Sequence, residues 1–351
     1  MASLPKVNFK QCKELAVIGL RAKKCPMLHS SPGIGKSAMA KQIAEELNLK
    51  LIDLRLSTID PTDLTGFLVP DKETRRADYY PPSIFPLAGI NEVPEGYRGW
   101  LLFLDEVTSA VPAMQAAAYR LILDKQVGEH DLHPKVLTMA AGNLATDKAV
   151  VNRMSTALQS RLAPHLHLEA SSDIWIEHAI NKGFDSRVVA YAEHRPEVLT
   201  SFNPSKADMT FACSRTMEFL SDIIKKLPAG SQAHDYKFTP LYAGTVGTGI
   251  GTEFRAFLEI YKDLVSFDEI VANPKTATVP DEPSAVFAMT GMIGERTNAS
   301  NLADVMKYVE RLGVEHQVSA IRKIAATSPD LTGRDEFTQW LDKHASQLYA
   351  G

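Results

Sequence analysis

Apolar residues recur along the first half of the chain with two different spacings. Helical spacing covers residues 9–24, 37–47 and 112–123. Short strand-like runs separate these helices at residues 27–28, 51–56, 99–104, 136–141 and 166–168. Strands that alternate with helices predict a parallel sheet with helices on both of its faces. We therefore expect an α/β fold that is built on a parallel five-stranded sheet.

The segment at 60–86 interrupts this alternation, and it is too long for a plain connection between two elements. Residues 66–69 and 77–80 predict one hairpin, and Gly128 favours a second hairpin at 126–133. We therefore expect an insert at about residues 60–90 within the α/β region.

Strand signals fade after Ala170, and helical patterns take over. They cover residues 175–191, 214–226, 284–296, 302–311, 315–327 and 335–347. The organisation that follows is an α/β core at 1–170, an α-helical lid at 171–265 and a helical C-terminal extension at 266–351.

Composition narrows the class of protein. The 351 residues are 45% hydrophobic and 23% charged, which is typical of globular domains. The net charge is -4 and the basic residues form only short pairs, so a large sequence-independent grip on nucleic acid is not expected. The three cysteines lack metal-ligand spacing. No segment resembles a signal peptide or a membrane span, which predicts a cytoplasmic protein without a membrane partner.

The strongest local signal is the run SSPGIGKS at residues 30–37, which lies between a predicted strand and a predicted helix. Its glycines let successive backbone N–H groups face a phosphate, and the following helix adds its N-terminal dipole. Lys36 is expected to reach the β- and γ-phosphates of ATP, and the Ser37 hydroxyl to ligate Mg²⁺. Ser30 stands where such loops normally have their first glycine. The predicted nucleotide-binding residues of this segment are Ser31, Pro32, Gly33, Ile34, Gly35, Lys36, Ser37 and Ala38.

Polar side chains also end the two buried strands that follow. Asp105 and Glu106 come after the apolar run 99–104, and Asn143 comes after 136–141. Parallel strands end at one edge of a sheet, so Asp105 is placed for the magnesium site and Glu106 for deprotonating the attacking water. Asn143 could hold that water or contact the γ-phosphate. Each motif taken alone also fits an ordinary glycine turn or an acidic helix cap.

The combination of these motifs resembles the AAA+ ATPases, and more narrowly their MoxR branch, which carries an insert in its second helix. The narrower marks are the run DPTDLTG at 60–66, the run LDEVT at 104–108 with Pro112 and Gln115, and the stretch 128–143. The resemblance covers about residues 10–260. It implies the P-loop NTPase fold and hydrolysis of ATP to ADP and phosphate.

The resemblance also assigns roles to single residues. Lys36 and Ser37 match the Walker A motif, Asp105 and Glu106 match Walker B, and Asn143 matches sensor 1. The resemblance also assigns roles to arginines. Arg161 matches the arginine finger that reaches a neighbouring subunit, Arg215 matches sensor 2, and Arg153 is a second candidate for the finger.

An arginine finger implies an assembly, and the resemblance predicts a hexameric ring. The leading hypothesis is an ATP-driven remodeller or chaperone that acts on a protein substrate together with a von Willebrand factor A domain partner. The alternatives are a McrB-like nucleic-acid translocase or restriction motor, and a nucleotide-gated scaffold with little turnover. Phe67, Tyr79 and Tyr80 of the insert are either pore contacts or packing residues.

Overall fold

The computed structural model describes residues 4–73, 75–144, 147, 152, 154–200, 202, 209–262 and 264–348. The chain separates into two compact units, the first ending at Ala170 and the second beginning at Ser171. Every helix in the described part of the chain is too short or too polar to span a bilayer.

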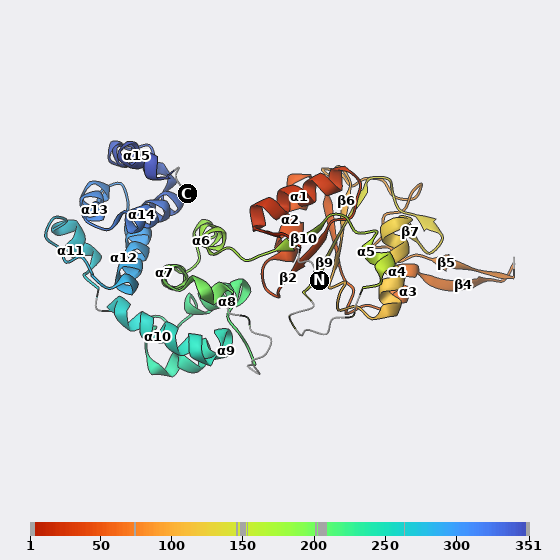
Figure 1. Cartoon of the computed structure of the whole chain (residues 1–351), viewed down its shortest axis with the longest axis horizontal. Coiled ribbons are helices and arrows are strands. Elements are labelled where there is room, and N and C mark those ends of the chain that lie inside the picture. The colour runs from red at the N-terminus through yellow and green to blue at the C-terminus, as the bar shows by residue number, and fades with distance from the viewer. Residues whose placement is uncertain are drawn as a thin grey trace. The chain divides into compact units, whose positions relative to one another are not determined.

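The first unit is built on a six-stranded parallel sheet (Figure 1). From one edge to the other the strands are β1 (Lys6–Val7), β10 (His165–Leu168), β2 (Met27–Ser30), β9 (Val136–Asn143), β6 (Trp100–Asp105) and β3 (Lys50–Arg55). The predicted parallel sheet is therefore confirmed, with one strand more than expected. That strand is β1, whose two residues are too few to give a periodic signal.

Both faces of this sheet are covered by helices, which is why its central strands are largely apolar. Leu101 and Phe103 of β6 pack with α1 (Phe9–Arg21) and α2 (Lys36–Glu46). Leu102 and Leu104, which point to the opposite face, pack with α4 (Pro112–Leu123) and α5 (Thr156–Gln159). The same alternation runs through β2 and β9.

Both predicted hairpins form: β4 (Phe67–Asp71) pairs with β5 (Arg76–Tyr80) within the insert, and β7 (Gln126–Val127) pairs with β8 (His130–Asp131) outside it. They follow the short helix α3 (Pro61–Thr65) and helix α4, respectively. Tyr79 packs against Gly128, and the Tyr79 carbonyl accepts a hydrogen bond from His130 Nε2 at 2.9 Å. Phe67 and Tyr80 face each other across the hairpin and are 56% and 61% exposed. Tyr79 is therefore a packing residue, while the other two aromatic side chains stay accessible.

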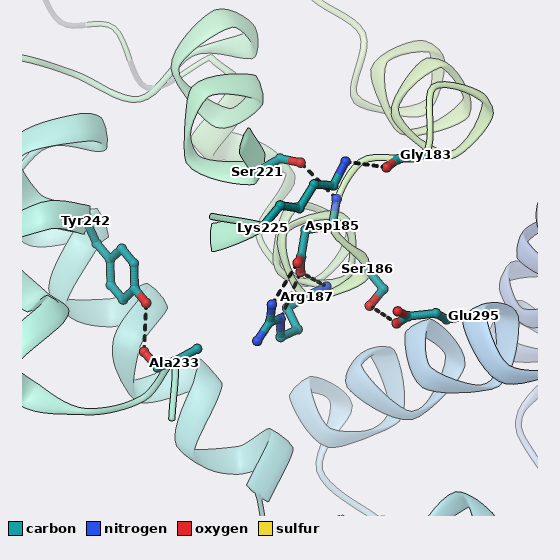
Figure 2. Close-up of polar contacts among 9 residues, drawn as sticks. All are labelled: Gly183, Asp185, Ser186, Arg187, Ser221, Lys225, Ala233, Tyr242 and Glu295. Atoms are coloured by element: carbon teal, nitrogen blue, oxygen red, sulfur yellow. Dashed lines mark hydrogen bonds and ion pairs between the residues drawn. The ribbon is translucent and has the colours of Figure 1, made fainter. Parts of the chain in front are cut away.

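The second unit is helical, as predicted, but its first predicted helix is wrong as a single element. The segment forms two helices, α6 (Ser172–Asn181) and α7 (Ser186–His194). Gly183, with φ 66°, ends the first, and the Asp185 side chain caps the second by accepting from the backbone N–H of Arg187 at 3.0 Å. Figure 2 shows Asp185 also bound to the Arg187 guanidinium, and Ser221 and Lys225 reaching the same turn.

Helices make up most of the rest of this unit in the described part of the chain, including the Gly- and Thr-rich segment at residues 227–253. The helices are α8 (Ser214–Ile224), α9 (Thr239–Val246), α10 (Thr248–Lys262), α11 (Phe267–Ala272), α12 (Pro283–Arg296), α13 (Leu302–Val309), α14 (Val314–Thr327) and α15 (Asp335–Leu348). Three short 3₁₀ turns, Pro196–Leu199, Tyr236–Phe238 and Pro329–Leu331, connect them. Gly251 explains part of the composition, because a Cβ there would lie 2.4 Å from the Ala243 backbone where α10 meets α9.

Helix α12 contributes to both hydrophobic cores of the second unit. Ala288 lies in the core that α6–α10 form, whereas Met289 and Ile293 lie in the core of α11–α15. A buried ion pair between Lys323 of α14 and Glu193 of α7 also links the two groups of helices. The division of this unit into a lid and an extension at residue 265 stays a prediction.

Candidate nucleotide-binding site

The glycine-rich loop joins β2 to α2 in a conformation that presents backbone donors. Gly33 and Gly35 have φ of 79° and 98°, a region that residues with a Cβ rarely adopt. Gly35 caps α2 without any side-chain hydrogen bond, so the first N–H groups of the helix keep their capacity for a ligand. A helix N-terminus with exposed N–H groups favours phosphate.

Lys36 lies at the first position of α2, and its ammonium turns back toward the strand ends. Its Nζ donates to Asn143 Oδ1 at 2.9 Å, to Ser30 Oγ at 3.1 Å, and to the carbonyls of Ser30 and Ser31 at 3.2 and 3.4 Å. The loop lysine and the sensor 1 candidate are thus in direct contact, although 107 positions separate them.

Ser30, which departs from the usual loop pattern, fits its position without strain. It is the last residue of β2, where the backbone is extended and glycine has no advantage. Its side chain is fully buried, donates to the Ser31 carbonyl at 3.0 Å and accepts from Lys36. The serine therefore adds a contact to the loop rather than distorting it.

Ser37 and Asp105 lie in direct contact. The Ser37 hydroxyl donates to Asp105 Oδ2 at 3.0 Å, and Asp105 Oδ1 accepts from the Glu106 backbone N–H at 2.8 Å. Asp105 is only 5% exposed. Hydroxyl and carboxylate oxygens are hard ligands, and Mg²⁺ in nucleotide sites takes only one or two protein ligands beside phosphates and waters. These two residues therefore fit a magnesium ion.

Glu106 follows β6 with the unusual φ of 58°. Its carboxylate accepts a short hydrogen bond from the Ser57 hydroxyl, two residues beyond the end of β3. Burial raises the pKa of Asp53 in β3, and the negative charges of Asp105 and Glu106 raise it further. Asp53, Asp105 and Glu106 thus lie near one another, while the positive charge of Arg55 lowers the pKa of Asp53.

The Thr108 hydroxyl holds the backbone of Asn143 in place. The Thr108 hydroxyl donates to the Asn143 carbonyl at 3.2 Å and accepts from its N–H at 2.9 Å. Gly142 allows this approach, since a Cβ there would lie 2.6 Å from the threonine side chain. The amide of Asn143 is thereby fixed against Lys36.

Two residues that contact the site, Ser57 and Asp147, were not predicted from the sequence. Ser57 binds Glu106, and Asp147 Oδ1 accepts from the Ser31 hydroxyl at 3.0 Å. The other oxygen of Asp147 is buried without a hydrogen bond in the described part of the chain. Ser57 could have been found, because every parallel strand of a sheet ends at the same edge and β3 is one of them. Asp147 carries no such signal.

The histidines His29 of β2 and His165 of β10 form a pair. His29 Nε2 lies 2.9 Å from His165 Nδ1, and the rings stack with their centres 5.2 Å apart. His165 Nε2 donates to the Gln159 carbonyl at 2.9 Å, so His165 Nδ1 accepts from His29. Burial, together with the nearby His165, His167 and Lys36, lowers the pKa of His29 to about 4.

The three predicted arginines differ in what the structure describes. Arg161 lies just after α5 and stacks on Tyr119 of α4, with its Cζ 4.0 Å from the ring centre. Arg215 is exposed at the start of α8 in the second unit, and its sensor role stays a prediction. Arg153 lies outside the described residues.

Comparisons with known proteins agree with the fold of the first unit. Residues 26–169 match the family described as ATPase family associated with various cellular activities (AAA). A comparison with curated proteins found no match. The similar solved structures include a mutant of RuvB from Thermotoga maritima, with 17% identity, a TM-score of 0.39, and coverage of 86% of this chain and 87% of that one.

Two further structures are similar at the same level. A second Thermotoga maritima RuvB mutant has 14% identity and a TM-score of 0.34 over 96% of this chain and 88% of its own. An ATPase candidate from Cytophaga hutchinsonii has 14% identity and a TM-score of 0.35 over 90% of this chain and 79% of its own. At TM-scores below 0.5, these likenesses add nothing about function. The family match does: residues 26–169, which are less than half of this chain, match the AAA ATPases.

Proposed function

We propose that this chain is an ATP-hydrolysing, ring-forming AAA+ motor of MoxR type that remodels a protein substrate. The observation that carries the proposal is the meeting of two residue pairs at one edge of the sheet. Lys36 contacts Asn143 at 2.9 Å, and Ser37 contacts Asp105 at 3.0 Å. Glu106 follows Asp105 directly. Phosphate binding, metal binding and base catalysis are thus available at one place.

The proposed reaction divides the work among these side chains. Lys36 and the N–H groups of the loop bind the β- and γ-phosphates of ATP. Glu106 accepts a proton from the water whose oxygen attacks the γ-phosphorus, while the bond from that phosphorus to the β-phosphate oxygen breaks. Asn143 orients the water. Ser37 and Asp105 would hold Mg²⁺, which would neutralise the charge that develops on the phosphate oxygens.

Ring formation enters through Arg161, which we assign to the γ-phosphate of the neighbouring subunit. A positive side chain at that position stabilises the charge of the transition state, and such fingers are worth roughly 10³- to 10⁵-fold in rate. A hexamer, a von Willebrand factor A domain partner and a protein substrate complete the proposal. These three elements rest on the resemblance to MoxR proteins. The exposed side chains of Phe67 and Tyr80 supply candidate contacts for the substrate.

Nucleotide binding is tested with Lys36→Ala. Two charge-assisted hydrogen bonds to phosphate are worth about 3 to 6 kcal/mol, so the Kd for ATP should rise by at least about 100-fold. Lys41→Ala is the matched control, because Lys41 lies exposed on the same helix. Equal affinities of the two variants for a fluorescent ATP analogue would contradict the loop assignment.

Ring-dependent hydrolysis is tested by the rate per subunit as a function of protein concentration, with Mg²⁺ present. Active sites completed between subunits predict a rate that rises steeply and then saturates, in step with assembly in sedimentation. A rate that stays constant while the protein dissociates would contradict the role of Arg161. Remodelling itself is tested by ATP-dependent unfolding of a tagged protein substrate in the presence of the partner.

A further inference from the structure

Arg161 is held within its own subunit by contacts that leave one end of the guanidinium open. The guanidinium carbon lies 4.0 Å from the centre of the Tyr119 ring, and Nη1 donates to the Ala157 carbonyl at 2.7 Å. Nε is buried and makes no hydrogen bond among the described residues. Nη2 is neither buried nor hydrogen-bonded there. The Tyr119 ring and the Ala157 carbonyl thus hold one face and one nitrogen of the guanidinium, and Nη2 is the nitrogen left for a ligand.

The backbone beneath this side chain is also fixed, although α5 has only four residues. Leu158 is fully buried in the core, and the Ser155 hydroxyl caps the turn by accepting from the Leu158 N–H. At the other end, His165 Nε2 donates to the Gln159 carbonyl, and His29 donates to His165. The turn that carries Arg161 is therefore anchored to the core and to two strands of the sheet.

The pose matters because an arginine is otherwise a flexible side chain. Ordering it costs about 2 kcal/mol of rotamer entropy, which a free arginine would lose when it meets an anion. An aromatic face that holds the guanidinium removes part of this cost in advance, since cation–π contacts contribute about 0.5 to 2 kcal/mol. Tyr119 itself packs against the hydrophobic core, so it is a firm support.

We propose that Tyr119 is a positioning residue for catalysis in trans: its ring, with the Ala157 carbonyl, holds Arg161 so that Nη2 is presented to the γ-phosphate of a neighbouring subunit. The inference rests on the proposed finger role of Arg161 and assigns to Tyr119 a function that no sequence motif marks. Tyr119 does not touch the nucleotide of its own subunit in this scheme. Its effect therefore belongs to the neighbour's active site.

The test replaces Tyr119 by Met, which fills similar space without an aromatic face, and by Phe, which keeps the face. Tyr119→Met should lower kcat at saturating ATP by about 2- to 30-fold, the range that loss of the stacking contact implies. The KM and Kd for ATP should change by less than about twofold, because Tyr119 acts only on the transition state. Tyr119→Phe should keep the wild-type kcat.

Rings mixed from two variants distinguish a positioning role from a structural one, because a residue that only stabilises its own subunit would not be rescued by a neighbouring subunit. Subunits with Lys36→Ala bind no ATP but donate an intact Arg161, so adding them to Tyr119→Met subunits should restore hydrolysis at the Tyr119→Met sites. Adding Arg161→Ala subunits instead should restore nothing. Sedimentation and thermal unfolding verify that each variant folds and assembles, and Tyr119→Leu, measured in the same way, replaces Met if that variant fails.

The outcomes separate this inference from the function on which it rests. Wild-type hydrolysis by Arg161→Ala would refute the finger role itself. A large loss in Arg161→Ala, together with equal kcat values for the Met and Phe variants of Tyr119, would refute only the inference. A higher kcat in Tyr119→Met would also overturn it, because the ring would then restrain the arginine.

Discussion

Two lysines, one in each unit, show how differently the two halves of the chain treat a partly or fully buried charge. Lys36 in the first unit donates to neutral oxygens of Ser30, Ser31 and Asn143. Lys323 in the second unit is 4% exposed and donates to the Glu193 carboxylate and to the Thr290 hydroxyl. The Glu193 carboxylate also cancels the charge of the Lys323 ammonium.

The two units use their buried polar groups for different purposes. The Glu193 carboxylate accepts a second hydrogen bond, from Ser319 at 3.0 Å, so the cluster of the second unit satisfies itself across three helices. In the first unit, polar side chains gather at strand ends beside N–H groups that no side chain caps. Polar groups of the first kind join helices, and those of the second kind suit a charged ligand.

The largest expected effect concerns the strand-end site. Glu106→Gln removes the proposed base but keeps the size and polarity of the side chain, so kcat should fall by about 10²- to 10⁴-fold. The affinity for ATP should stay within about threefold of wild type, because the loop is untouched. Single-turnover hydrolysis and direct nucleotide binding measure the two quantities. Normal turnover in this variant would remove Glu106 from the base role and weaken the contrast between the units.

The second prediction concerns the buried polar cluster around Glu193 and Lys323 in the second unit. Glu193→Gln leaves Lys323 buried with its charge no longer cancelled, which should lower the free energy of unfolding of the second unit by about 3 kcal/mol. Replacing both residues, as Glu193→Leu with Lys323→Met, should recover most of that loss. Urea unfolding followed by peptide-resolved hydrogen exchange assigns the change to the second unit.

An exposed ion pair of the same unit supplies the control for that experiment. Lys307 and Asp304 lie one helical turn apart on α13, with their side chains 49% and 38% exposed. Asp304→Asn should cost less than about 1 kcal/mol, because solvent screens the pair. A cost equal to that of Glu193→Gln would mean that burial is not what makes the Lys323 pair matter.

The smallest prediction concerns pH and the His29–His165 pair. The pKa of His29 is lowered to about 4, so below about pH 6.5 the unfolded chain binds a proton that the folded chain refuses. This histidine should therefore cost the first unit about 2 kcal/mol of stability between pH 7 and pH 5, with the loss levelling off below pH 4. His29→Gln, whose amide can still donate to His165, should reduce that loss. An identical pH dependence in both proteins would contradict it.

The sequence predicted much of the first unit because its signals are local. A buried parallel strand is a continuous apolar run, as in β6 from Trp100 to Leu104, and a glycine loop before a helix has its own pattern. Even the meeting of Ser37 with Asp105 followed from one rule about where parallel strands end. The second unit was harder, because Gly183 and Asp185 break a helical pattern that hydrophobic spacing alone continues.

By itself, then, the sequence determined the parallel sheet, the loop that starts α2, and the polar residues that end β6 and β9. These depend on neighbours in the chain and on spacing. Only the tertiary structure decided that Asp147 binds Ser31, that His29 pairs with His165, and that Tyr119 supports Arg161. Each of these contacts joins two elements whose mutual distance no local pattern encodes, since packing of the whole unit brings them together.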